Sequence, residues 1–199
     1  MENMMKVLLI AISILSLGAL EFKYEVLSDS YNFVRPYVII DEGSECLKVL
    51  KAQGVQFKTL GNAGSGQCFI KNAVRVTKFS STTIGNALTL NCSTATKLSK
   101  WLKSIDAKQI KHMGSYNCRR IGGSRLLSEH SFGTAIDVSS INGVSIKNNW
   151  DSIYLKDSFS KACSLFANVL GPDDNKAHKD HFHLDNGFGF GCFFKTFVR

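Results

Sequence analysis

The chain has 199 residues, of which 44% are hydrophobic and 20% are charged. This length and balance suit one globular domain with a sizeable core and exclude a wholly disordered chain. The formal net charge of +8 favours anionic partners such as a cell-wall polymer, acidic lipid headgroups or nucleic acid. The lysines and arginines are scattered and form no nucleic-acid motif. We therefore expect peptidoglycan or another anionic wall polymer as partner, and no specific nucleic acid.

An apolar run lies near the N-terminus. Residues 7–20 are apolar or small, follow Lys6 and precede Glu21. Such a run is shorter than the roughly 20 residues that span a bilayer, but it fits the core of a secretory signal. We expect residues 1–20 to be a signal peptide cleaved after about Ala19, with a retained membrane anchor as the alternative. The protein would then be periplasmic or secreted, and it would contact a membrane if the segment is retained.

All six cysteines follow this run, and none forms a Cys-x-x-Cys pair: Cys46, Cys68, Cys92, Cys118, Cys163 and Cys192. An even number of cysteines together with an export signal favours three disulfides in an oxidising compartment. The spacing does not give the pairing. A late helix and a last strand are often neighbours, which favours Cys163 with Cys192.

The first part of the chain predicts a short N-terminal segment followed by a domain. Residues 21–41 are mixed and aromatic, and they suit either a tether or a strand that pads the domain. The domain would cover residues 42–199. Ser44 begins a predicted helix at 45–53, which Gly54 can end in a left-handed conformation. Val74 and Val76 alternate with charged residues, as in a half-exposed strand.

The middle of the chain predicts a second helix and two strands. Apolar residues recur at helical spacing within 93–105, and we expect this stripe to lie in the core: Ala95, Leu98, Trp101, Leu102 and Ile105. Residues 109–116 and 135–141 suit strands. Asn142-Gly143 is a strong two-residue turn signal, which predicts a hairpin from 135–141 to 144–146.

The last part predicts a third helix at 157–170, with Asp157 as its N-cap and Gly171-Pro172 ending it. Its buried residues would be Phe159, Ala162, Cys163, Phe166 and Leu170. The aromatic tail at 187–191 suits a packed loop. Helices between strands joined by hairpins predict an α+β fold, with a small, mainly antiparallel sheet and about three flanking helices.

Two motifs carry the chemistry: the run from Ser128 to Asp137, which holds His130, and the later His181-Phe182-His183. A His, Asp and His set is that of a catalytic zinc site, which leaves one position open to water. Zinc lowers the pKa of bound water toward neutrality, so the set indicates hydrolysis. In a strand the two late histidines would face the same side. Gly133 and Ala135 are small enough to let backbone approach closely.

These motifs resemble those of the zinc peptidases that cut bacterial peptidoglycan cross-links, often grouped with D-alanyl-D-alanine carboxypeptidases, and the related metal site of hedgehog domains. Together with 114–119, 169–173 and 177–185, they look more like the bacterial extensin-like C-terminal domain family. The resemblance spans about Cys46 to Cys192, and the cysteines sit where that family places its own. It implies a hedgehog/D-Ala-D-Ala peptidase-like fold.

The resemblance also implies roles for single residues. His130, Asp137 and His183 would be the ligands of Zn²⁺, and His181 would orient water or substrate. Arg119 would bind the substrate carboxylate or the developing oxyanion, a task that suits a forked cation. An ordinary surface salt bridge is the alternative for Arg119.

The residue at the position of the general base differs from that of the carboxypeptidases. The carboxypeptidases have a Glu three residues before the last zinc histidine, whereas this chain has the shorter Asp180 there. His178 is the other candidate, since some murein endopeptidases use histidines. Asp185 could instead fix the tautomer of a ligating histidine. We further expect Ser128 to bond within the turn that presents His130, and Glu129 to face solvent.

The resemblance leads us to expect an exported, zinc-dependent peptidoglycan peptidase that hydrolyses a D-amino-acid-containing peptide bond. A non-catalytic, zinc-stabilised wall-binding or host-interaction module is the alternative. A metal-free, disulfide-rich scaffold is a third possibility, and it would require His130, Asp137 and His183 to lie apart in space.

Overall fold

The protein is described by a computed structural model, which covers residues 25–35 and 43–188. Its elements follow one another along the chain as α2 (Ser44–Ala52), β1 (Val55–Ser65), β2 (Cys68–Phe79), β3 (Thr82–Asn91), α3 (Cys92–Ser104), β4 (Ile110–Gly114), η1 (Glu129–Phe132), β5 (Ala135–Ile141), β6 (Val144–Ser145), α4 (Ile146–Asn149), α5 (Ile153–Cys163), β7 (Asn168–Leu170), η2 (Lys176–His178) and β8 (Phe182–Asp185). The predicted α+β class is confirmed.

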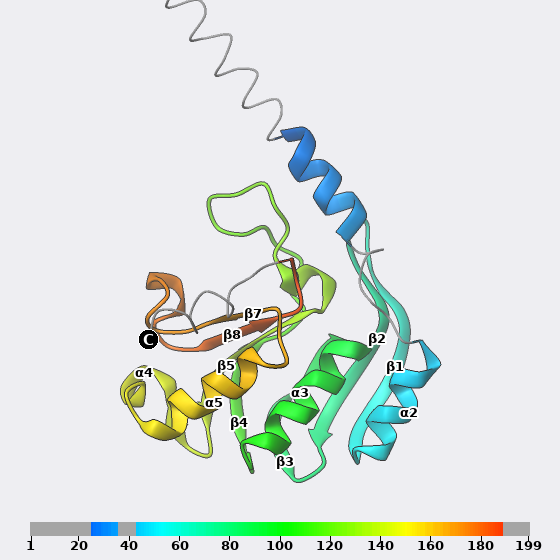
Figure 1. Cartoon of the computed structure of the whole chain (residues 1–199). Coiled ribbons are helices and arrows are strands. Elements are labelled where there is room, and N and C mark those ends of the chain that lie inside the picture. The colour runs from blue at the N-terminus through cyan, green and yellow to red at the C-terminus, as the bar shows by residue number, and fades with distance from the viewer. Residues whose placement is uncertain (1–24, 36–42, 189–199) are drawn as a thin grey trace, which may run out of the picture.

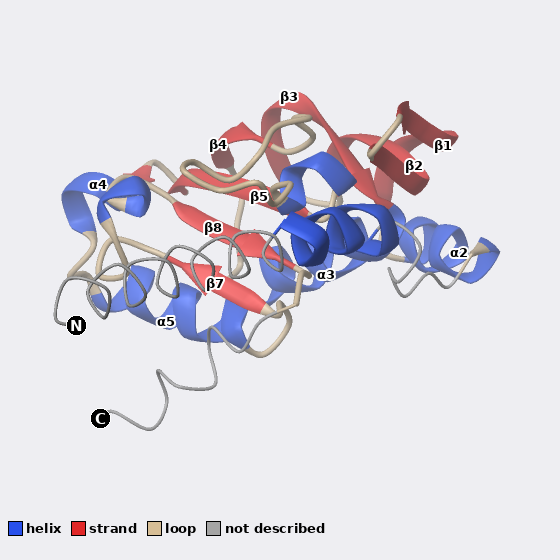
Figure 2. Ribbon diagram, turned by 90° about the horizontal axis from the view of Figure 1, so that it is seen from above, coloured by secondary structure: helices blue, strands red, loops and turns tan. Residues whose placement is uncertain are grey.

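The strands form two antiparallel sheets instead of one. The first has the order β1-β2-β3, and the second has the order β4-β5-β8-β7 (Figure 1). The short strand β6 pairs with β5. An isolated parallel bridge links Thr83 of β3 to Gln109, the residue before β4. The site depends on the second sheet, in which β5 and β8 lie side by side (Figure 2).

One continuous core lies between these sheets and the helices α3 and α5. Alternate residues of β5 and β8, such as Ile136, Val138 and Leu184, are buried in it. Trp101 of α3 is fully buried, and its indole N–H donates to the carbonyl of Ser158 on α5 at 2.9 Å. Because side chains alternate along a strand, the residues between these core positions face the other side of the sheet.

Several predicted elements are confirmed closely. The helix expected at 93–105 is α3, and all five residues of its predicted apolar stripe are buried. Asn91 caps it by accepting hydrogen bonds from the backbone N–H groups of Ser93 and Thr94. The strand at 135–141 is β5. Asn142 and Gly143 both have positive φ, as a tight hairpin turn requires, although Ile146 already begins α4.

Other strand and helix predictions are confirmed in place. The helix at 45–53 is α2, shifted by one residue, and Gly54 follows it with φ of 71°. The residues around Val74 and Val76 belong to β2, and those at 109–116 contain β4. Strands β1 and β3 were not predicted. β1 contains two glycines and is mostly exposed, so it carries little of the alternation that marks a strand.

The predicted helix at 157–170 is wrong in both of its bounds. The helix α5 begins four residues earlier, because the Ser152 hydroxyl caps it by accepting from the backbone N–H of Leu155. Asp157 lies inside the helix and pairs with Lys161 at 2.7 Å. The end at 168–170 is strand β7, because its backbone pairs with β8. Tertiary pairing overrides local helical periodicity there.

The segment expected to be a tether or a padding strand contains a helix instead. Residues 25–35 are helical and lie against the loop that precedes η1 (Figure 1). The helix turns polar residues toward the domain, since Ser28, Asn32 and Arg35 are buried while Leu27 is 68% exposed. The amide of Asn32 donates to the carbonyl of Arg125 and accepts from the backbone N–H of Leu127. Because the face of this helix that packs on the domain is polar, apolar periodicity does not predict the helix or its contact with the domain.

One disulfide joins two helices, and another joins the first sheet to the loop before the site. Cys46 on α2 is bonded to Cys92 at the start of α3, and Cys68 on β2 is bonded to Cys118 in the loop before the site. Cys163 is also disulfide-bonded. Its expected partner, Cys192, lies outside the described residues, as do the predicted signal segment at 1–20 and most of the tail at 187–191. Such bonds persist in oxidising compartments, in keeping with an extracellular or periplasmic location. Within residues 25–35 and 43–188, no helix is long and apolar enough to span a membrane.

Candidate metal centre

His130 is held on a short helical turn. The hydroxyl of Ser128 accepts a hydrogen bond from the backbone N–H of His130, as expected, and so begins the 3₁₀ helix η1. Gly133 ends the turn with φ of 64°, in the left-handed region. A Cβ on Gly133 would lie 3.0 Å from the backbone nitrogen of Asn91, so glycine is required both by conformation and by close approach. The turn thereby directs His130 inward, with only 2% of its surface exposed.

The ring of His130 has one satisfied nitrogen and one unsatisfied nitrogen. Its Nδ1 contacts the backbone carbonyl of Ser115, which can only accept, so Nδ1 carries the proton. In the neutral ring Nε2 then holds a lone pair. Nε2 is buried without a hydrogen-bond partner and lies 3.1 Å from Oδ2 of Asp137. A lone pair facing a carboxylate at this distance calls for a cation or a proton between the two atoms.

Asp137 lies at the centre of the cluster, on β5. It pairs in register with His183 on β8, so the two side chains are neighbours on one face of the sheet. Oδ1 of Asp137 accepts from Nδ1 of His183 at 2.8 Å. Burial acts to raise the pKa of Asp137, but the two neighbouring imidazoles, His130 and His183, lower it overall. Asp137 is therefore ionised.

His183 faces a carboxylate on each side. Its Nδ1 contacts Asp137, and its Nε2 contacts Oδ2 of Asp185 at 2.9 Å. Burial acts to lower the pKa of His183, but its bonds to Asp137 and Asp185 raise it to about 9. The carboxylate of Asp185 also accepts from the side-chain amide of Asn168 and from the backbone N–H of Gly187. Asp185 thus holds the ring of His183 from the side opposite Asp137.

The three residues fit a zinc ion. One nitrogen or oxygen atom from each of His130, Asp137 and His183 lies within 4.8 Å of the others. Two ligand atoms each about 2.0 Å from a tetrahedral zinc lie roughly 3.3 Å apart, close to the 3.1 Å between His130 Nε2 and Asp137 Oδ2. Each histidine also has its second nitrogen held by an outer acceptor, which is the usual support of a metal-binding imidazole.

Two further histidine rings border the cluster. The ring centre of His178 lies 5.5 Å from that of His183 and 5.1 Å from that of His181. Nε2 of His181 lies 3.6 Å from Oδ1 of Asp137. Nδ1 of His178 contacts the amide oxygen of Asn175, which leaves Nε2 as the acceptor. Burial, followed by the charges of His183 and His181, lowers the pKa of His178 to about 4, so the ring is neutral at pH 7.

Asp180 lies behind His181, away from the centre of the cluster. Its Oδ1 accepts from Nδ1 of His181 at 2.8 Å, and about half of its side chain is exposed. This bond lowers the pKa of Asp180. The carboxylate therefore orients the ring of His181 and leaves Nε2 of that ring directed toward Asp137.

Arg119 is exposed, and its guanidinium contacts the backbone carbonyl of Arg120. Its backbone N–H donates to the hydroxyl of Ser131 on η1, which ties this loop to the turn that carries His130. Within the described residues, the guanidinium makes no contact with the three candidate ligands.

The expectation that Glu129 faces solvent is wrong. Glu129 is 8% exposed and forms a bidentate pair with Arg35, from Nε to Oε1 at 2.9 Å and from Nη2 to Oε2 at 2.6 Å. The hydroxyls of Tyr31 and Thr134 also donate to its carboxylate. Arg35, the immediate support of η1, was missed because 94 residues separate it from Glu129 and no local signal connects them. The carbonyl of Ser115 was missed because a backbone acceptor leaves no mark in the sequence.

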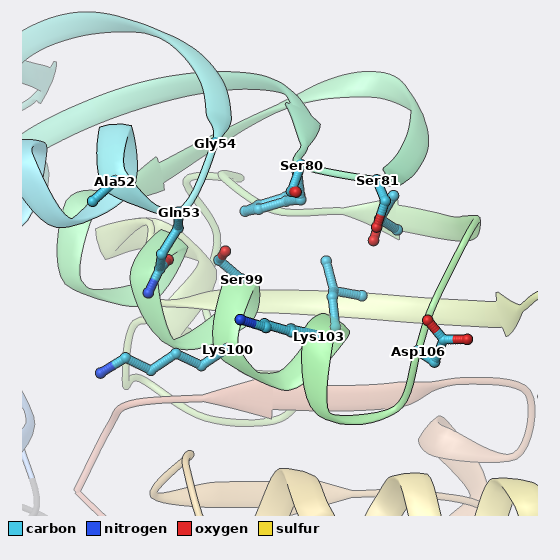
Figure 3. A pocket seen from close by; sticks show the side chains of 12 residues that line it. Ala52, Gln53, Gly54, Ser80, Ser81, Ser99, Lys100, Lys103 and Asp106 are labelled. Atoms are coloured by element: carbon cyan, nitrogen blue, oxygen red, sulfur yellow. The ribbon is translucent and has the colours of Figure 1, made fainter.

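A separate hollow of about 670 Å³ lies between α2, the β2–β3 turn and α3. Ser80 and Ser81 face Ser99 and Lys103 across it (Figure 3). None of its lining residues belongs to the histidine cluster.

Over residues 44–190 the sequence matches the protein family described as Extensin-like protein C-terminus, and the chain belongs to this family. The match covers every element from α2 to β8 and includes His130, Asp137 and His183. The comparisons found no matching curated protein and no matching solved structure.

Proposed function

We propose that this protein is a zinc-dependent hydrolase of peptide bonds in peptidoglycan. One observation carries the proposal: the buried Nε2 of His130 has no hydrogen-bond partner and faces the ionised carboxylate of Asp137. Burying a polar atom unpaired is costly, and a cation bound between these atoms removes that cost. His130, Asp137 and His183 would hold the ion. When bound, Zn²⁺ supplies Lewis acidity that polarises a carbonyl and lowers the pKa of water.

The neighbouring histidines suit proton transfer. A general base needs a free lone pair near the reacting water and a second group that fixes its ring. His181 meets both needs, because Asp180 holds its Nδ1 and its Nε2 points toward Asp137. His178 presents a neutral ring beside it. We assign proton transfer to His181, with His178 as the second candidate and with Asp180 as a positioning residue. Arg119 would neutralise the oxyanion only after its side chain turns from Arg120.

The test is digestion of purified muropeptides by the oxidised, zinc-loaded protein. We expect new amino termini to appear, and we expect their release to stop with a chelator and in His183→Ala. His112→Ala is the matched control, because His112 lies on β4 and contacts the backbone carbonyl of Asn86 outside the cluster. Zinc occupancy without cleavage across a broad muropeptide panel would overturn the proposal.

One observation favours a second candidate, a zinc-stabilised module that binds wall polymer without cleaving it. The carboxylate at the position of the expected base is occupied by His181, and the guanidinium of Arg119 is turned to Arg120. Binding to insoluble peptidoglycan that persists in His183→Ala, with no turnover by the zinc-loaded protein, would support this candidate.

A further inference from the structure

A second hollow, of about 330 Å³, begins beside the histidine cluster. Its lining includes Asp180, the two lysines Lys111 and Lys147, and Met113 and Ser139. Three strands, β4, β5 and β6, contribute to its floor. It is therefore built largely on the same sheet that carries Asp137.

The hollow and the cluster are adjacent along β5. Asp137 and Ser139 are two residues apart on this strand, and both are half-buried, whereas Ile136 and Val138 are fully buried in the core. Alternation places Asp137 and Ser139 on one face of the sheet. At about 3.3 Å per residue, Ser139 lies roughly 7 Å along the strand from Asp137. An extended peptide bound at the cluster would reach the hollow after about two residues.

The charges of the hollow are unbalanced. Lys111 and Lys147 are exposed, and neither ammonium forms an ion pair within residues 25–35 and 43–188. The one carboxylate that lines the hollow, Asp180, bonds to His181 and also feels the charge of Lys147. Two cations therefore line a concave surface that holds a single anion, which leaves the hollow with a net positive charge. Such a site suits a carboxylate, since each ammonium is a point charge with three rotatable donors.

We propose that this hollow binds a carboxylate of the substrate peptide, carried about two residues from the bond at the cluster. The substrate class is thus an acidic peptide, whose aliphatic part would pack on Met113, 59% exposed. This inference rests on the proposed function for the position of the scissile bond. The carboxylate could belong to a side chain or to the peptide C-terminus, and both sources share the same chemistry.

The experiment uses the zinc-loaded full chain and three forms of one stem peptide: both carboxylates free, side chain amidated, and C-terminus amidated. The variant is Lys111→Met with Lys147→Met, and the control is Lys58→Met on the exposed part of β1. In the double variant we expect KM for the free peptide to rise about tenfold with kcat changed less than about twofold. The amidated form that lacks the recognised carboxylate should already show the high KM and should not respond to the variant. Equal effects on all three peptides, or no effect, would overturn the proposal.

Binding of the same peptides keeps this test separate from the proposed function. If the wild type cleaves none of them, the peptidase proposal fails, and peptide titration followed by NMR shifts or calorimetry still tests the subsite. The subsite is supported if the wild type binds the free peptide more tightly than an amidated one, and if this difference is lost in the double variant and retained in Lys58→Met. Equal affinities for the free and both amidated peptides would overturn it.

Discussion

The imidazole of His130 is fixed in one tautomer by a backbone carbonyl, and that single contact determines what its other nitrogen can do. With Nδ1 donating to Ser115, Nε2 is left as a buried lone pair beside Asp137. His183 differs, because both of its nitrogens face carboxylates and its pKa is raised to about 9. A zinc ion that takes Nδ1 of His183 must displace a proton.

Zinc binding at pH 7 should therefore release about one proton per chain. The raised pKa means that His183 is protonated below about pH 9 in the metal-free protein. Zinc competes with this proton, so the apparent affinity should fall about tenfold for each unit that the pH drops from 9 toward 7. Calorimetric titration in two buffers with different heats of ionisation measures the release. Identical heats in both buffers would contradict it.

Asp180 and His181 form a hydrogen-bonded pair beside the candidate ligands. Asp180→Asn keeps an oxygen for Nδ1 of His181 but removes the negative charge beside the ring. We expect kcat on muropeptides to fall roughly 10–100-fold, in the range that outer partners of active-site histidines contribute. Zinc content should not change, because Asp180 is not one of the three ligands.

Asp151→Asn serves as the control for that variant, because the side chain of Asp151 is fully exposed at 100%. The pH profile of kcat distinguishes a positioning role from a structural one. A shift of its acidic limb is expected in Asp180→Asn alone. Loss of zinc together with activity would show that Asp180 supports the fold of the site instead.

At the scale of elements, the helix at 25–35 supports the turn that carries His130. Arg35 reaches Glu129, the residue before His130, and also donates to the carbonyl of Asn186 at 3.0 Å. The pair is 3% and 9% exposed, so each charge depends on the other for its solvation. Burial, followed by the charge of Glu129, also raises the pKa of Tyr31.

Arg35→Met should destabilise the protein by about 3–5 kcal/mol, because it leaves the Glu129 carboxylate buried without its cation. Urea unfolding measures the change. Arg125→Met is the control: it removes the ion pair with Glu25, whose side chains are about half exposed at 48% and 50%, and should cost at most about 1 kcal/mol. The double variant Arg35→Met with Glu129→Gln should recover part of the loss. A change below about 1 kcal/mol in Arg35→Met would refute this role.

The elements also show where a sequence suffices and where it does not. The bounds of α3 and β5 could be predicted because the apolar stripe lies within α3 and the turn residues Asn142 and Gly143 directly follow β5. The start of α5 was misplaced because Asp157 resembles a cap while Ser152 provides it. Its end was misplaced because β7 exists only through its pairing with β8.

At the scale of the whole molecule, three separate segments bring the candidate ligands together. His130 comes from η1, Asp137 from β5 and His183 from β8, and the pairing of β5 with β8 places the last two in register. The two motifs predicted this meeting, since their residue types and spacing are those of a metal site. The supports from Arg35, Ser115 and the Cys68–Cys118 disulfide are long-range or backbone contacts, which no local pattern indicates.

Zinc content of the purified, oxidised protein tests the central claim most directly, because it depends on the cluster and not on the substrate. We expect one zinc per chain after dialysis, lost in His130→Ala and retained in His112→Ala, together with a zinc-dependent rise in the thermal midpoint. Absence of bound zinc, or zinc bound equally well by His130→Ala, would contradict the assignment of His130, Asp137 and His183 as its ligands.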